Sequence, residues 1–161
     1  IHVLKALQRL PNIEYWIVGD GPYKRQIQYR AKDLGVYNRV KFFGLVDDEE
    51  LIQIYKQTDI FVMPTTKTKI DREGFGIVYL EAQLFGLPVI GSNHPGVNEA
   101  ILNKKTGYLI SNYKEELQKR LERLIYDTGL RKKMSKNGRD FVLQNFTRQK
   151  QCEKLDIIFS I

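Results

Sequence analysis

The sequence has 161 residues, which is enough for one domain with a single hydrophobic core. Its 42% hydrophobic and 28% charged residues are ordinary for a globular fold, and no apolar run approaches the ~20 residues that span a bilayer. The single cysteine excludes an intrachain disulfide and a cysteine-based metal cage within these residues. We therefore expect a reducing, cytoplasmic location. The amphipathic first residues lack a small-residue cleavage site and are not expected to form a signal peptide.

The opening residues show a helical pattern, and no strand precedes it. A Rossmann-like unit usually begins with a strand, and that strand usually lies centrally in the sheet. We therefore expect residues 1–161 to be a fragment of a longer protein, with the first strand missing from its sheet. Upstream residues or a strand of another chain would fill the resulting gap.

Short, continuous apolar runs alternate with helical patterns along most of the chain. Such runs are typical of strands that are covered on both faces. The predicted strands are Ile13–Val18, Val40–Phe43, Ile60–Met63, Val89–Gly91 and Tyr108–Ile110. Their starts are 19 to 29 residues apart, which leaves room for one helix in each crossover. The alternation predicts the α/β class, with a doubly wound, Rossmann-like parallel sheet and further helices at the C-terminus.

Start and stop signals mark the helices of these crossovers. We expect Pro22 at the first position of one helix, and Asp47, three residues before Glu50, as the N-cap of the next. A third helix is expected to begin after Gly76 and to end at Gly86. The side chains expected to face the core are Ile27, Ala31, Leu34, Leu51, Ile54, Tyr55, Ile77, Leu80, Leu84, Leu117, Leu121, Leu124 and Ile125.

The net charge of +7 is concentrated toward the C-terminus, where residues 111–161 hold 12 lysines and arginines against seven acidic residues. A phosphate-bearing ligand or an acidic membrane surface is compatible with this excess. A solvated outer face on C-terminal helices is the more ordinary explanation. No aromatic residue is interleaved with the basic ones in a stacking pattern, so nucleic acid is not an expected partner.

The turn Gly74-Phe75-Gly76 is the sharpest candidate for a binding site. Ligands of open α/β sheets bind beyond the carboxyl ends of the strands, and this turn follows one of the predicted strands. Its two glycines let the backbone approach a ligand, and the next helix presents free N–H groups and the positive end of its dipole. An anion fits such a site, and phosphate is the common one.

Two glutamates, Glu73 and Glu81, frame this turn. Eight residues of helix rise about 12 Å, which exceeds the ~5–9.5 Å between the paired carboxylates that cleave a glycosidic bond. Carboxylates also accept hydrogen bonds from sugar and ribose hydroxyls. The pair therefore fits the two ends of an elongated ligand with a diphosphate between them, and a nucleotide diphosphate sugar has that order.

Residues 73–101 read EGFGIVYLEAQLFGLPVIGSNHPGVNEAI and resemble the E-x7-E signature of retaining glycosyltransferases of family four, which have the GT-B fold. The resemblance continues in register through YWIVGDGPYKRQIQ, VKFFGLVDDEELIQIYKQTDIFVMPT, NKKTGYLI and FVLQNFTRQKQCEKL. It implies that residues 1–161 are the C-terminal, donor-binding half of such an enzyme.

The resemblance also implies roles for single residues at the sugar and the ribose. Glu73 matches the catalytic glutamate that contacts hydroxyls of the transferred sugar, and Glu81 matches the acid that holds the ribose. Phe75, Gly76 and Ile77 match the segment whose backbone meets the distal phosphate and the sugar.

Further positions match the nucleotide end of the donor. Val46 and Asp48 correspond to the base-binding turn, and Gly19 and Gly21 to a glycine turn near the nucleotide. The basic residues with which the family neutralises the diphosphate fall before Ile1 in register. The acceptor-binding half of the family also lies outside this sequence.

Other polar residues have less defined roles. Pro95-Gly96 stands where the family often has two glycines, and His94 beside it is expected to form local hydrogen bonds. Lys67, Lys69 and Arg72 either assist the phosphates or are solvated loop charges, and Cys152 is expected on a helix, partly buried. No histidine, cysteine and acid cluster has metal-ligand spacing, so neither a metal nor another cofactor is expected.

The resemblance implies a retaining glycosyltransferase of the hexosyltransferase type, acting in polysaccharide biosynthesis. It would move a sugar from a nucleotide diphosphate sugar to a glycan or lipid-linked acceptor bound by the missing N-terminal domain. The isolated fragment is expected to be inactive, and the full-length enzyme is expected in the cytoplasm, where it could associate peripherally with a membrane. The alternatives are a nucleotide-sugar epimerase of the same fold, a non-catalytic nucleotide-sugar binding module and a flavodoxin-like signalling domain.

Overall fold

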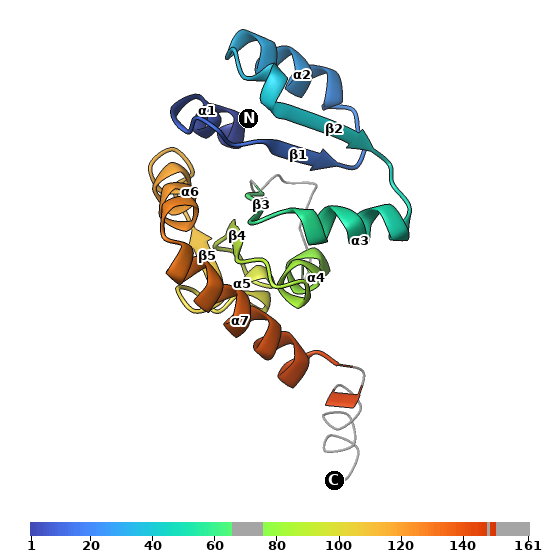
Figure 1. The fold of residues 1–161 in the computed structure, drawn as a ribbon, viewed down its shortest axis with the longest axis vertical. Coiled ribbons are helices and arrows are strands. Elements are labelled where there is room, and N and C mark those ends of the chain that lie inside the picture. Colours follow the sequence, from blue (N-terminus) through green and yellow to red (C-terminus); the bar gives the residue numbers. More distant parts are fainter. Residues whose placement is uncertain (66–75, 148, 151–161) are drawn as a thin grey trace.

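The computed structural model describes residues 1–65, 76–147 and 149–150 of the chain. Within these residues, parallel strands alternate with helices, as the sequence predicted (Figure 1). The strands are β1 Tyr15–Val18, β2 Val40–Gly44, β3 Phe61–Met63, β4 Val89–Ser92 and β5 Gly107–Ile110. The helices are α1 His2–Arg9, α2 Lys24–Asp33, α3 Asp48–Gln57, α4 Ile77–Leu84, α5 Val97–Ala100, α6 Glu116–Tyr126 and α7 Thr128–Asn145, with a short 3-10 helix at Tyr37–Arg39.

The strands form two separate parallel pieces. β1 pairs with β2, with Tyr15 opposite Val40. The other piece has the order β3-β4-β5, with Phe61 opposite Val89 and Val89 opposite Gly107. The α/β prediction is confirmed, and the break between β1 and β3 agrees with the expected gap in the sheet.

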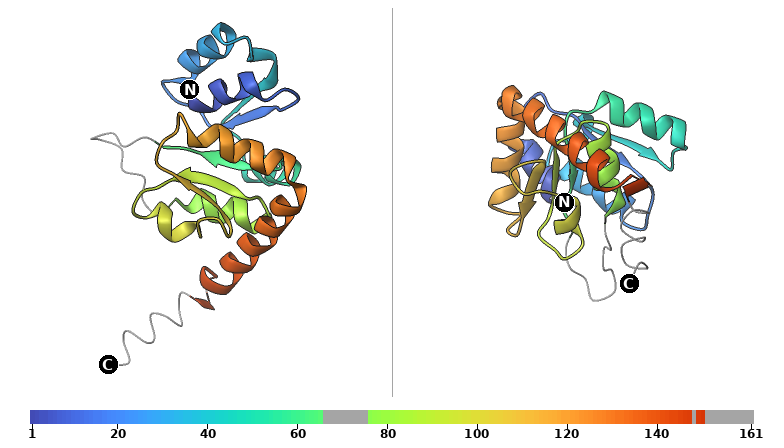
Figure 2. Two further views of the ribbon diagram at one scale, coloured as in Figure 1. Left: turned by 90° about the vertical axis from the view of Figure 1, so that its left-hand side faces the viewer. Right: turned by 90° about the horizontal axis from the view of Figure 1, so that it is seen from below.

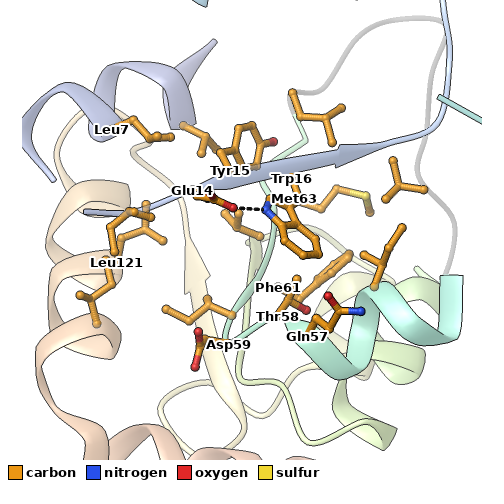
Figure 3. Close-up of a pocket in the computed structure, with 18 of the residues that line it drawn as sticks. Leu7, Glu14, Tyr15, Trp16, Gln57, Thr58, Asp59, Phe61, Met63 and Leu121 are labelled. Atoms are coloured by element: carbon orange, nitrogen blue, oxygen red, sulfur yellow. Dashed lines mark hydrogen bonds between the residues drawn. The ribbon is translucent and has the colours of Figure 1, made fainter. Parts of the chain in front are cut away.

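A cavity of about 660 Å³ lies at this break, between β1 and β3 (Figure 3). Its lining is largely apolar and aromatic and includes Tyr15, Trp16, Phe61 and Met63. The indole N–H of Trp16 donates a hydrogen bond to the Glu14 carboxylate at 2.9 Å. Because each of these strands is paired on one side only in the described residues, the cavity is bordered by two open strand edges.

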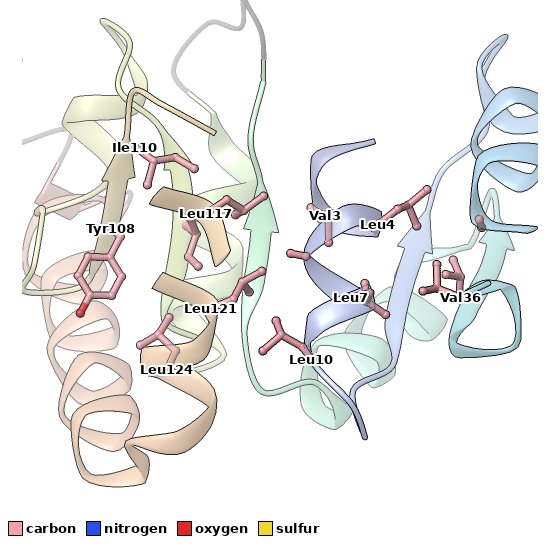
Figure 4. Packing of buried hydrophobic residues seen from close by; sticks show 14 of the residues in the cluster. Val3, Leu4, Leu7, Leu10, Val36, Tyr108, Ile110, Leu117, Leu121 and Leu124 are labelled. Carbon is pink, nitrogen blue, oxygen red and sulfur yellow. The ribbon is translucent and has the colours of Figure 1, made fainter. Parts of the chain in front are cut away.

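Helix α1 lies between the two pieces and supplies much of their shared core (Figure 4). Its buried side chains recur at helical spacing, and the α6 stripe packs in the same cluster. These residues are Val3, Leu4, Leu7, Leu10, Leu117, Leu121 and Leu124. Each fully buried leucine contributes roughly 1.5–3 kcal/mol to folding, so this layer stabilises the fold around the break.

Helix α7 packs along α4 on the side of β3, β4 and β5 (Figures 1 and 2). Their contact is close because Gly138 of α7 lies against the side chain of Gln83. A Cβ atom built at position 138 would lie only 3.1 Å from that side chain. The buried Gln83 amide donates hydrogen bonds to the carbonyls of Tyr79 and Ala100, at 2.9 and 2.8 Å.

This packing corrects the predicted core face of α4. Ile77 is 65% exposed and Leu84 is 40% exposed, whereas the buried residues of the helix are Tyr79, Ala82 and Gln83. A polar glutamine takes a core position because its amide bonds backbone carbonyls there. The prediction is wrong for Ile77 and Leu84, because the packed face of the helix runs through Tyr79, Ala82 and Gln83; Leu80 is partly buried against the core, as predicted.

Three helix starts had been predicted, and two of them are correct: the start of α3 after Asp47 and the start of α4 directly after Gly76. The Asp47 carboxylate accepts a hydrogen bond from the Glu50 N–H at 2.8 Å, so Asp47 is the N-cap of α3. Pro22 is not the first residue of α2, which begins at Lys24. A turn closed by the Lys24 N–H on the Gly21 carbonyl, at 3.1 Å, holds Pro22 outside the helix.

Candidate functional site

The turns after the parallel strands come together at the carboxyl edge of each sheet piece. The Gly19 N–H donates to the Gly44 carbonyl at 2.6 Å, which joins the turn after β1 to the turn after β2. Gly21 is exposed, and its N–H donates to the Asp20 carboxylate at 2.8 Å. The structure therefore places the predicted glycine turn directly beside the turn that leads to Val46.

The Val46 turn continues straight into α3. Val46 is half-buried, and Asp48 is the exposed first residue of the helix. Leu45 beside them is 84% exposed. This turn thus presents backbone groups and one large apolar side chain at its surface.

Lys24 is a cation that the sequence reasoning missed in this region. Its ammonium lies 3.1 Å from the Asp20 carboxylate, and a Cβ built on Gly44 would stand 3.7 Å from the same ammonium. The Gly21 N–H and then the Lys24 ammonium lower the pKa of Asp20 below its usual value. The i,i+4 spacing of Asp20 and Lys24 was the available signal.

The start of α4 has a left-handed backbone at its N-cap. Gly76 is its N-cap, with φ of 70°, and among the residues that the structure describes no side chain caps the helix there. The first N–H groups of any helix lack partners inside the helix, and the first turn of α4 contains no acidic residue. By contrast, α3 is capped by Asp47 and has three acids in its first turn. An anion is therefore favoured at α4 and disfavoured at α3.

Ile77 and Glu81 follow on α4, while Glu73 and Phe75 lie outside the described residues. Ile77 is the exposed first residue of the helix. Glu81 is half-buried about one turn farther along, and its carboxylate accepts a hydrogen bond from the Tyr55 hydroxyl at 3.1 Å. The described part of the predicted site thus combines the N-terminus of α4 with the Glu81 carboxylate, which Tyr55 of α3 hydrogen-bonds.

A second polar cluster surrounds the carbonyl oxygen of Thr65, just after β3. Ser92 donates its hydroxyl to this oxygen at 2.7 Å, and the Tyr113 hydroxyl also bonds it. The ring Nε2 of His94 lies 3.2 Å from the same oxygen. His94 is therefore the local hydrogen-bonding residue that the sequence suggested. The contribution of Tyr113 was missed, because its partner is 48 residues away in the chain.

The described residues contain no group of three or more histidine, cysteine or acidic side chains that could hold a metal ion. No described helix is both long and apolar enough to cross a membrane. Lys67, Lys69, Arg72 and Cys152 lie outside the described part of the chain.

A comparison with family models supplies the deciding observation. The model for glycosyl transferases group 1 matches residues 1–141. The chain belongs to this family. Glycosyltransferases are also among the curated relatives. A GDP-mannose-dependent alpha-(1-6)-phosphatidylinositol monomannoside mannosyltransferase of Mycolicibacterium smegmatis is 35% identical over 142 residues, which are 86% of this chain and 37% of that protein. The chain thus spans well under half the length of this relative.

Solved structures of glycosyl transferases agree with the fold. The C-terminal domain of the group 1 glycosyl transferase LpcC of Francisella tularensis is 27% identical, with a TM-score of 0.79 over 91% of this chain and 76% of that domain. Anabaena HepE, crystallised with UDP-glucose, is 26% identical, with a TM-score of 0.83 over 99% of this chain and 44% of that protein. The Rossmann-like half of the GT-B fold that the resemblance implied is confirmed, and the epimerase alternative is not favoured.

Proposed function

We propose that residues 1–161 are the donor-binding half of a retaining glycosyltransferase, which moves a sugar from a nucleotide diphosphate sugar to a glycan or lipid-linked acceptor. The observation that carries this proposal is the N-terminus of α4, which no described side chain caps, with the Glu81 carboxylate about one turn beyond it. Family membership supports the reaction class. HepE, similar in fold over 99% of this chain, was crystallised with UDP-glucose, which supports a nucleotide sugar as the ligand.

The donor would lie along the carboxyl edge of the sheet. The base would meet Val46 and Asp48, with Gly19 and Gly21 close to the nucleotide, and Glu81 would accept hydrogen bonds from the ribose hydroxyls. The diphosphate would meet the backbone of Gly76 and Ile77 at the start of α4. Phe75 would line the same segment, and Glu73 would contact the hydroxyls of the transferred sugar.

Departure of the nucleoside diphosphate leaves an oxocarbenium-like centre on the sugar and concentrates negative charge on the phosphates. The preorganised amides of α4 stabilise that charge more in the transition state than in the ground state. No carboxylate needs to act as a nucleophile, and the acceptor attacks from the face that the leaving group has left. The helix amides and basic residues neutralise the diphosphate, so we propose transfer without a metal or another cofactor.

The rest of the enzyme would supply three things: the basic residues for the diphosphate, an acceptor-binding domain and a central strand. The cavity between β1 and β3, bordered by two open strand edges, supports the last of these. Closure of the two domains over the donor would exclude water, which otherwise hydrolyses it. The M. smegmatis relative is named for a phosphatidylinositol monomannoside, which supports a lipid-linked acceptor and work at a membrane surface.

Two measurements on the intact protein test the proposal. Calorimetric titration with UDP-, GDP- and ADP-sugars should show binding of at least one of them, and an acceptor assay should show transfer with retention. Glu73→Ala should lower turnover by more than about tenfold, because it removes a transition-state contact, while Glu81→Ala should mainly weaken donor binding. Binding without turnover would instead favour a non-catalytic binding module, and unchanged kinetics in both variants would refute the site assignment.

A further inference from the structure

A hydrogen bond between Tyr55 and Glu81 connects α3 with α4 across 26 residues of sequence. The Tyr55 hydroxyl donates to Oε2 of the Glu81 carboxylate at 3.1 Å. Among the residues that the structure describes, no other side chain hydrogen-bonds or ion-pairs with this carboxylate. Since an ionised carboxylate accepts on both oxygens, Oε1 keeps its capacity to accept from a ligand.

The Tyr55 ring is held firmly in place. Its residue is only 7% exposed, and the ring stacks on Phe85 with centroids 5.2 Å apart and planes 11° apart. The Phe61 ring of β3 also packs against the Tyr55 ring, with the two centroids 6.3 Å apart. Tyrosine has only two side-chain torsions, and both are fixed by this packing. A glutamate side chain is much freer and loses conformational entropy when it must adopt one position. A fixed donor on Oε2 removes part of that cost before the ligand arrives.

The hydroxyl stays a donor at any physiological pH. Burial raises the pKa of Tyr55 well above its ordinary value, and the negative charge of Glu81 raises it further. The bond to the carboxylate is therefore charge-assisted, with tyrosine as the donor.

We propose that Tyr55 is a positioning residue, whose hydroxyl fixes the Glu81 carboxylate so that its second oxygen receives the ribose of the nucleotide donor. The inference rests on the proposed ribose-binding role of Glu81. It also connects two parts of the site, since Tyr55 belongs to α3, which begins at Asp48, two residues after Val46. Tyr55 therefore links the turn that is proposed to bind the base with the carboxylate that is proposed to bind the ribose.

A purely structural bond between α3 and α4 is the competing explanation, and ribose chemistry distinguishes the two. The probes are UDP and GDP, each compared with its 2′,3′-dideoxy form, which lacks the hydroxyls that Glu81 would accept from. The affinities are measured by calorimetry on the intact protein, for the wild type and three variants. Tyr55→Phe removes only the hydroxyl, and Glu81→Gln removes the charge. Tyr79→Phe is the matched control, because its buried hydroxyl donates to the Met63 carbonyl at 2.6 Å in the same aromatic cluster.

We expect Tyr55→Phe to weaken binding of the ribose nucleotide roughly five- to tenfold, the effect of losing the net contribution of one typical hydrogen bond. Binding of the dideoxy form should change less than about twofold, because that form makes no use of the positioned oxygen. The preference for ribose should shrink in Tyr55→Phe and Glu81→Gln and persist in Tyr79→Phe. A second experiment uses wild-type protein labelled with 3-fluorotyrosine at position 55. The chemical shift of the fluorine resonance should change when UDP or GDP is added and should remain unchanged when the dideoxy form is added. This second readout does not depend on the stability of a variant.

Each other outcome contradicts a separate part of the reasoning. A ribose preference that is lost in Glu81→Gln but intact in Tyr55→Phe would overturn the positioning role and leave the proposed function standing. An equal loss in Tyr55→Phe and Tyr79→Phe would make the bond merely structural. A wild type that binds nucleotides without any ribose preference would overturn both this inference and the ribose-binding role of Glu81.

Discussion

Replacing Gly76 by alanine tests the anion site at the start of α4. Gly76 has φ of 70° and ψ of 55°, a left-handed conformation that costs a residue with a Cβ roughly 1–2 kcal/mol. A domain of this size loses about 2–4 °C of melting temperature per kcal/mol, so Gly76→Ala should melt roughly 2–8 °C lower. The added methyl group also lies where the backbone is proposed to meet the diphosphate. Losing the favourable interaction of an anion with the helix terminus, about 1–2 kcal/mol, should raise the Kd of a nucleoside diphosphate about five- to thirtyfold.

Gly86, at the other end of the same helix, provides the matched control. It also has positive φ, 78°, and a Cβ built there would meet no atom within 4 Å. Gly86→Ala should therefore lower the melting temperature by a similar amount without touching the proposed ligand. Melting curves and calorimetric titrations with UDP and GDP on both variants separate the two effects. Equal affinities in Gly76→Ala and Gly86→Ala would refute the anion site.

Three further predictions concern stability, pH and metals. Asp47→Ala removes the N-cap of α3, which should cost about 1 kcal/mol and lower the melting temperature by about 2–4 °C; an unchanged melting temperature would show that the cap is dispensable. Burial raises the pKa of Tyr15 to about 12, so its contribution to stability is complete below the unfolded value of about 10 and is lost as the pH rises from 10 toward 12. Denaturant titrations between pH 9 and 12 should show a shallower alkaline loss in Tyr15→Phe, and an unaltered slope would contradict the assigned burial effect. The intact enzyme should keep its transfer rate in EDTA, and a rate restored only by added divalent cations would contradict the metal-free proposal.

The order of the elements was predictable from sequence because local signals determine it. Continuous apolar runs predicted each strand of the described residues, with both predicted ends within two residues of the observed ends. The pair Asp47 and Glu50 predicted the start of α3. Each of these signals lies within a few neighbouring residues of the chain.

Long-range packing was not predictable in the same way. The buried face of α4 depends on Gln83 meeting Gly138, and an apolar count cannot detect a glutamine whose amide bonds backbone carbonyls. The bond between Tyr55 and Glu81 joins residues 26 apart, and the Thr65 carbonyl gathers partners up to 48 residues away. The family resemblance indicated Glu81, but only the structure showed which side chain holds it.

A crystal structure of the intact protein with its nucleotide sugar is the most direct test of the central claim. A phosphate oxygen of the donor should lie within about 3 Å of the N–H groups at the start of α4, with the ribose hydroxyls on Glu81. A nucleotide sugar whose diphosphate lies away from Gly76 and Ile77, with those amides bonded to protein or water instead, would contradict it.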